Sequence, residues 1–210
     1  MSIADPATDY YHINRRVPWS PYITLNPGDV FDVGGSSNPY FNFFEKQKKA
    51  YLVTQGDGSK EVLGGARFIN AVAMGEVNSP NVAQIADELV RHLVAYIREL
   101  IWENVRMKEF PHLPSRQRCI WLIPNIAGVN YWINRMGITG EYQILRVKVQ
   151  GRLHVASESF LLGDSEPMEE TIAKARRYWL GIIETPGTEE ILFEGRVKVM
   201  GLASNKERHT

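Results

Sequence analysis

The longest regular pattern in the chain is helical, and it lies between stretches that have the composition of strands. Ser79 is a suitable N-cap, Pro80 suits the first helical position, and Pro111 ends the pattern. Between these residues, apolar side chains recur at the i, i+3, i+4 spacing of one helix face. They are Val82, Ile85, Ala86, Leu89, Val90, Leu93, Val94, Ile97, Leu100, Ile101 and Val105. The pattern predicts one long helix over about residues 80–110.

Strand signals flank this helix on both sides. Residues 9–15, 118–123, 142–149 and 190–200 are rich in β-branched and aromatic residues or alternate between polar and apolar side chains. The alternation in 142–149 predicts a half-buried strand, which we expect to turn at Gly151. Shorter helices are expected over about 124–136 and 168–180. The chain therefore mixes helices with several separate strands.

Length and composition favour a single domain over residues 1–210 and give no argument for a nucleic-acid or membrane partner. Lys+Arg and Asp+Glu balance at 24 each. The one cysteine, Cys119, excludes an intrachain disulfide and lies in an apolar run, which favours a buried thiol in a reducing compartment. The N-terminus lacks the features of a signal peptide, and no apolar run reaches the roughly 18 residues of a membrane span. We expect a cytoplasmic protein.

The common catalytic motifs do not occur in the chain. It has no Gly-x-x-x-x-Gly-Lys-Ser/Thr loop, no Gly-x-Gly-x-x-Gly loop after a strand, and no His-Glu-x-x-His, Cys-x-x-Cys or Gly-x-Ser-x-Gly motif. Metal-dependent hydrolysis and serine-nucleophile chemistry therefore have no specific support, and no metal site is predicted.

An ordered set of segments carries the functional signal. In chain order they are Tyr10-Tyr11-His12, Leu25-x-Pro27-Gly28-Asp29-Val30 with the following Gly/Ser/Asn loop, Cys119-Ile120-Trp121-Leu122-Ile123-Pro124-Asn125-Ile126-Ala127, Ile144-Leu145-Arg146-Val147-Lys148-Val149 before Gly151, and Glu189-Glu190-Ile191-Leu192-Phe193-Glu194-Gly195-Arg196-Val197. This order resembles the small rifamycin-modifying ADP-ribosyltransferases, within the His–Tyr–Glu class that has diphtheria-toxin-like and poly-ADP-ribose-polymerase-like folds. The resemblance covers residues 9–38 and 118–200.

The resemblance implies an α+β fold with split β-sheets around an NAD cleft. Residues of about 40–116, including the long helix, would be a largely helical, family-specific insertion. The implied activity is that of an NAD-dependent, metal-independent ADP-ribosyltransferase, a glycosyltransferase that uses NAD as substrate. The acceptor is left open among a small molecule, a protein and a nucleic acid. An intracellular toxin or phage-defence effector with a neutralising protein partner is a further hypothesis from the same resemblance.

The resemblance also assigns roles to individual residues. His12 would bind the adenosine ribose, and Trp121 would stack on the nicotinamide, where the family commonly has a tyrosine. Glu190 would bind the nicotinamide-ribose hydroxyl and favour the positive charge that develops on the ribose. The remaining candidates for NAD binding are Tyr11, Arg15, Gly34, Gly35 and Ser36, and Arg16 is a second candidate for the pyrophosphate.

The acidic position has more than one candidate. Glu189, Glu190 and Glu194 lie in one expected strand, where a period of two puts Glu190 and Glu194 on the same face. The register with the family motif favours Glu190, and Glu194 is the reserve.

Other interpretations compete with this one. His12, Trp121 and Glu190 have ordinary structural explanations as a satisfied histidine, a core aromatic and a solvated carboxylate. Arg91, His92 and Arg98 are expected on the solvated face of the long helix, and the tyrosines and tryptophans at 131–132 and 178–179 are expected to pack against the sheet. A non-catalytic nucleotide-binding module of the same fold is the first alternative function. A nucleic-acid-binding effector is the second, with a basic face formed by Arg15, Arg16, Arg116, Arg118 and Arg135.

Overall fold

The computed structural model describes residues 2–5, 7–16, 24–54 and 57–206, and it mixes helices with antiparallel sheets. In chain order the elements are β1 (Ser2–Ile3), β2 (Tyr10–Arg15), β3 (Val30–Val33), α1 (Pro39–Lys46), β4 (Ala50–Thr54), β5 (Lys60–Gly64), α2 (Gly65–Ala73), α3 (Val82–Glu109), β6 (Ile120–Leu122), α4 (Ile126–Arg135), β7 (Tyr142–Ser157), the short 3-10 helix η1 (Glu158–Phe160), α5 (Met168–Trp179) and β8 (Glu189–Lys206). The expected mixture of helices and strands is confirmed. No helix in these ranges has both the length and the apolar character to span a membrane.

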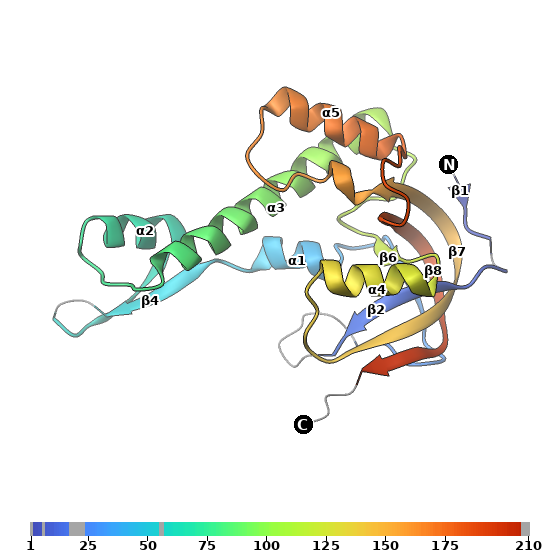
Figure 1. Cartoon of the computed structure of the whole chain (residues 1–210), viewed down its shortest axis with the longest axis horizontal. Helices are drawn as coiled ribbons and strands as arrows, with labels where there is room; N and C mark the ends of the chain where they lie inside the picture. Colours follow the sequence, from blue (N-terminus) through green and yellow to red (C-terminus); the bar gives the residue numbers. More distant parts are fainter. Residues whose placement is uncertain (1, 6, 17–23, 55–56, 207–210) are drawn as a thin grey trace.

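Two long strands, β7 and β8, form the backbone of the main sheet. They pair antiparallel along their whole length, from Tyr142 opposite Lys206 to Ser157 opposite Glu189. Each strand has two short partners on its free edge. β2 pairs with residues 142–147 of β7 and β1 with residues 152–153, whereas β6 pairs with residues 191–193 of β8 and β3 with residues 195–198. The sheet thus has two halves that share the β7–β8 pair, which curves through both (Figure 1).

The two halves meet where Gly151 of β7 faces Gly195 of β8. A Cβ atom built on Gly195 would lie 2.5 Å from the carbonyl oxygen of Gln150, and one on Gly151 would collide with the carbonyl oxygen of Glu194. Only glycine allows the two backbones this close. The turn that the sequence predicts at Gly151 is therefore wrong, because β7 continues through this residue as one strand to Ser157.

Helices cover the sheet in two places. The C-terminal half of α3 packs with α5 over a core that contains Trp102, Phe160, Tyr178 and Trp179. On the other half, α4 lies over β2 and buries Val129 completely. The predicted helices over 124–136 and 168–180 are confirmed as α4 and α5.

An arm projects from this body (Figure 1) and consists of the β4–β5 hairpin, α2 and the first half of α3. It has a small core of its own around Val53, Leu63, Phe68 and Ala71. The arm and α1 lie within the region of about 40–116 that the resemblance implies is an insertion. This region contains a two-stranded hairpin besides its helices.

The long helix begins slightly later than the sequence predicts. α3 starts at Val82 after Asn81, which makes no side-chain capping hydrogen bond, so the predicted N-cap at Ser79 is wrong. The helix ends at Glu109, two residues before Pro111, as expected.

Candidate functional site

A cleft of about 560 Å³ lies where the end of β6 and the start of β8 meet β2. It is lined by His12 and Arg15 from β2, Trp121 from β6 and Glu190 from β8. Tyr40, Arg98 and Arg116 line it on the side of α1 and α3, and Trp132, Arg135 and Glu158 on the side of α4 and η1. Its volume is within the usual range of small-molecule sites.

The pairing of β2 with the end of β6 fixes the His12 ring. Tyr11 and Ile123 exchange two backbone hydrogen bonds of 2.9 Å, and the Nδ1 atom of His12 then lies 3.0 Å from the carbonyl oxygen of Trp121. Because a carbonyl only accepts, Nδ1 carries the hydrogen and Nε2 is left as an acceptor in the neutral ring. Burial lowers the pKa of His12, and the bond to Trp121 opposes this only in part. The imidazole is therefore neutral at pH 7.

Trp121 is half-buried in the cleft wall, where its neighbours include a tyrosine ring and a guanidinium. The ring of Tyr40 meets it edge-on at 5.8 Å between centroids, and the guanidinium of Arg116 lies 5.7 Å from its centroid. These contacts restrict the orientation of the indole and favour a defined surface for an aromatic ligand.

Glu190 is buried at the start of β8 and is held by two donors. Arg116 Nη1 and the hydroxyl of Tyr178 both donate to its Oε1 atom. Within the described part of the chain, no hydrogen bond is made to its Oε2 atom. The carboxylate of this cleft residue is thus fixed through one of its two oxygens.

Arg116 connects Glu190 to α3. Its Nε and Nη2 atoms also donate to the two carboxylate oxygens of Glu99, over 3.1 and 3.2 Å. Burial alone would lower the pKa of Arg116, but the two carboxylates raise it well above its usual value. Burial has the opposite effect on Tyr178 and raises the pKa of its hydroxyl well above the usual value. The hydroxyl therefore stays protonated and donates.

The other two acidic candidates lie outside the cleft. Glu194 is buried on the same face of β8 as Glu190, where it accepts from the backbone N–H of Ser115 over 2.9 Å and pairs with Arg152 over 2.6 Å. The Oε2 atom of Glu189 accepts from the backbone N–H of Gly187 over 2.8 Å. Of the three carboxylates, only that of Glu190 lines the cleft.

Comparison with known families gives one match. Residues 10–207 match the model of a family described as "Protein of unknown function (DUF2441)". The chain belongs to this family. No curated protein matches the chain. The matched range of this DUF2441 protein includes the whole cleft, from His12 to Glu190.

Four of the predicted NAD-binding residues of the DUF2441 protein do not line the cleft. Tyr11 packs on the α4 side, against the cluster around Ile123 and Val129. Gly34, Gly35 and Ser36 follow β3, and Gly34 lies against the side chain of Glu194.

Two arginines that line the cleft are less exposed than the sequence predicts. Arg98 is expected on the solvated face of the helix, but it donates to the Tyr40 hydroxyl over 2.9 Å and to the carbonyl of Leu162 over 3.3 Å. Arg116 is buried, so it is not part of an exposed basic face. Glu99, Glu103 and Arg106, at helical spacing among apolar residues, were the available sequence signal for a buried charged network.

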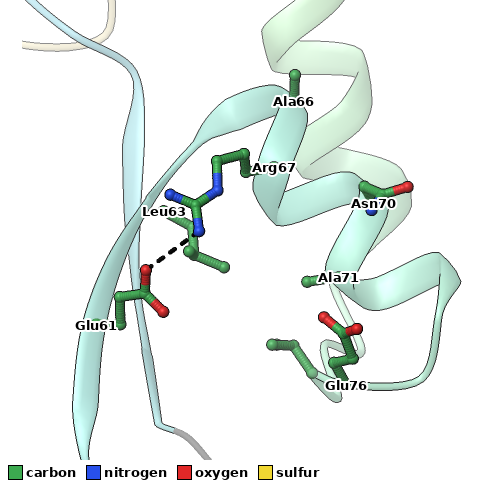
Figure 2. Close-up of a pocket in the computed structure, with 8 residues that line it drawn as sticks. Glu61, Leu63, Ala66, Arg67, Asn70, Ala71 and Glu76 are labelled. Atoms are coloured by element: carbon green, nitrogen blue, oxygen red, sulfur yellow. Dashed lines mark hydrogen bonds and ion pairs between the residues drawn. The ribbon is translucent and has the colours of Figure 1, made fainter.

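A second hollow, of about 430 Å³, lies in the arm between β5 and α2 (Figure 2). Arg67 of α2 reaches back to Glu61 of β5 with an ion pair of 3.3 Å, and both side chains are well exposed. None of the predicted site residues lines this hollow. The candidate site of the DUF2441 protein is therefore the cleft beside β2, β6 and β8.

Proposed function

We propose that this DUF2441 protein is an NAD-dependent ADP-ribosyltransferase with the fold of that class. The observation that carries the proposal is the position of His12, Trp121 and Glu190. They come from three different strands, β2, β6 and β8, and they line one cleft. The resemblance selects the same three residues for contacts to NAD, from the sequence alone.

The free oxygen of Glu190 supplies the electrostatic part of the reaction. Transfer breaks the bond between nicotinamide and the ribose, so positive charge develops on the ribose and the bonding pair leaves with the nicotinamide. A carboxylate that is fixed in advance stabilises such charge better than a mobile one. Oε2 would accept a hydrogen bond from the nicotinamide-ribose hydroxyl, while Arg116 and Tyr178 keep the carboxylate in place.

The neighbouring residues supply binding and orientation. The Nε2 atom of His12 is an acceptor, so it suits a ribose hydroxyl that donates to it. The Trp121 ring offers a face for the nicotinamide. Arg15 is exposed on the cleft wall, and within the described residues no carboxylate pairs with it, so its guanidinium suits a phosphate oxygen.

Calorimetry with NAD tests the binding part of the proposal. We expect wild-type protein to bind NAD and expect His12→Ala and Trp121→Ala each to weaken binding by at least about tenfold. Arg118→Ala is the matched control, because Arg118 is exposed and does not line the cleft. Absence of NAD binding by the folded wild-type protein would overturn the proposal.

A non-catalytic NAD-binding module of the same fold is the second candidate. Two features favour it: Oε1 of Glu190 is already occupied by two donors, and Trp121 has no phenolic hydroxyl. Binding of NAD without any release of nicotinamide, in the presence of cell lysate as a source of acceptors, would favour this module over the transferase.

A further inference from the structure

Most apolar residues of α3 pack within the chain, but one stripe does not. Ile85 packs against the core of the arm, and Tyr96 stacks on Phe44 of α1. Val94, Ile101 and Val105 contact the core beneath α5. The exposed stripe contains Val90, Leu93, Ile97 and Leu100, which are 53%, 53%, 45% and 44% exposed. The sequence pattern puts these aliphatic residues on one apolar face of the helix, whereas the structure leaves the stripe in solvent. A contiguous apolar surface of this kind marks an interaction site.

The exposed stripe has the spacing of the residues that form the seam between the two helices of a coiled coil. Its four residues follow one another at alternating steps of three and four. Val90 and Ile97 occupy equivalent positions, as do Leu93 and Leu100. β-Branched residues at the first set and leucines at the second are the combination that favours pairing of two parallel helices. The same steps continue along the rest of the helix, to Ala83, Ala86, Asn104 and Met107.

We propose that this stripe binds a second copy of the same chain, with the two α3 helices parallel and in register. A self-complementary seam suits a twofold dimer, because each copy offers the same surface to the other. Trp102, which is completely buried against the rest of the chain, lies on the side of α3 opposite the stripe, so the bodies of the two copies point away from the seam. This inference is independent of the activity proposed for the cleft.

Asn104 favours the parallel direction. It is exposed and follows Val90 and Ile97 in the first set of seam positions, where a single asparagine specifies register and a two-stranded pair. In a parallel pair the two Asn104 amides face each other and can exchange a hydrogen bond. An antiparallel pair centred on Ile97 and Leu100 would instead bury each Asn104 against Leu93 of the other copy.

Charges on the flank of the stripe favour an antiparallel pair, but their effect is weaker than that of Asn104. Asp87 and Lys108 lie near opposite ends of α3, so an antiparallel pair would bring each Asp87 to the Lys108 of the other copy. Exposed ion pairs of this kind are worth about 0–1 kcal/mol, and Asp87 already pairs with Arg91 of its own helix. A buried amide without a partner costs about 1–3 kcal/mol. The balance favours the parallel pair.

The size of the stripe predicts a dimer that dissociates on dilution. A helix of 28 residues is about 42 Å long and about 10 Å wide. Its footprint is therefore about 400 Å² per copy, roughly half that of a standard interface. The monomer should be visible at low concentration and the dimer at high concentration.

Sedimentation velocity over a range of concentrations tests the dimer. We expect the mass to rise towards twice that of the chain, and expect Leu93→Glu and Ile97→Glu each to raise the dissociation constant at least about tenfold. Leu180→Glu is the matched control, since Leu180 is equally apolar and exposed but lies at the end of α5. Circular dichroism checks that each variant is folded. A wild-type protein that stays monomeric at every concentration would overturn the proposal, and so would an equal effect of Leu180→Glu.

Cysteine cross-linking tests the direction. The native Cys119 is buried, so added thiols on α3 react separately from it. In a parallel, in-register pair, Val90→Cys protein cross-links efficiently to itself, and so does Met107→Cys protein. The two variants do not cross-link to each other when they are mixed, because their thiols lie at opposite ends of the seam. Efficient cross-linking between Val90→Cys and Met107→Cys would show an antiparallel pair and overturn the proposed arrangement.

Discussion

Arg116 donates a hydrogen bond to the carboxylate of Glu190, and both side chains are buried next to the cleft. The same guanidinium holds Glu99 of α3, so one residue ties the start of β8 to the long helix. Burying such a group of charges carries a large desolvation cost and adds little to stability compared with an apolar core. The arrangement is better explained by what it does for Glu190, a cleft residue, which is to fix its carboxylate through one oxygen.

Replacing Arg116 should destabilise the fold strongly. Arg116→Met would leave Glu99 and Glu190 as buried carboxylates without their main partner, and breaking a buried pair in this way costs about 3–5 kcal/mol. Urea denaturation gives the free energy of unfolding. Arg118→Met, two residues away and exposed, should change it by less than about 0.5 kcal/mol. Equal losses in the two variants would contradict the role given to Arg116.

The close approach of β7 and β8 at Gly151 and Gly195 should not tolerate a side chain. Gly195→Ala puts a Cβ 2.5 Å from the carbonyl oxygen of Gln150, at a φ of +138° that other residues rarely adopt. We expect a loss of about 1–3 kcal/mol or more in thermal or urea unfolding. Gly201→Ala in the same strand is the control, because its Cβ would have no neighbour within 4 Å. A Gly195→Ala variant as stable as the control would show that the two halves of the sheet do not depend on this contact.

Stability should fall in mild acid, partly because of His12. Burial lowers the pKa of His12 in the folded protein below the value of about 6.5 that it has in the unfolded chain. The unfolded state therefore takes up the proton first, so this contribution to stability is complete above pH 6.5 and is lost as the pH falls through the folded-state pKa. The free energy of unfolding should decrease more between pH 7 and pH 5 in wild-type protein than in His12→Gln. Parallel pH profiles for the two proteins would rule out a His12 that is held neutral in the folded protein.

The size of the ring at position 121 should matter more than its polarity. Trp121→Tyr retains an aromatic face and restores the residue that the resembled family commonly has, so NAD affinity should stay within about tenfold of wild type. Trp121→Ala removes the face and should weaken NAD binding by at least about tenfold, because a base–aromatic stack is worth about 1–3 kcal/mol. Calorimetric titration with NAD measures both. If Trp121→Ala binds as well as Trp121→Tyr, the ring does not stack on the ligand.

The elements with a strong local pattern could be predicted from the sequence. The periodicity of apolar residues in α3 and the alternation in β7 are local properties, and both elements form. The order of short motifs also led to His12, Trp121 and Glu190, which the structure brings to one cleft. Their roles towards NAD are still predictions.

Properties that depend on distant partners could not be predicted. Gly151 has the signature of a turn, and only its position opposite Gly195 shows that it lies in a continuous strand. Arg116 has no local signal that separates a surface charge from a buried one, because Glu99 and Glu190 come from elements far along the chain. In the same way, periodicity identifies apolar residues of α3 but not which stripe the rest of the chain covers.

Release of nicotinamide from NAD by purified protein tests the central claim most directly, with wild type, Glu190→Gln and Glu189→Gln measured side by side. Glu189 is the neighbouring carboxylate and does not line the cleft, so it is the matched control. We expect wild-type protein and Glu189→Gln to release nicotinamide at similar rates and Glu190→Gln to be slower by about 10²–10³-fold, the usual cost of removing a fixed charge-stabilising group. No release by the folded wild-type protein, even with cell lysate added as a source of acceptors, or an unchanged rate in Glu190→Gln, would contradict the account.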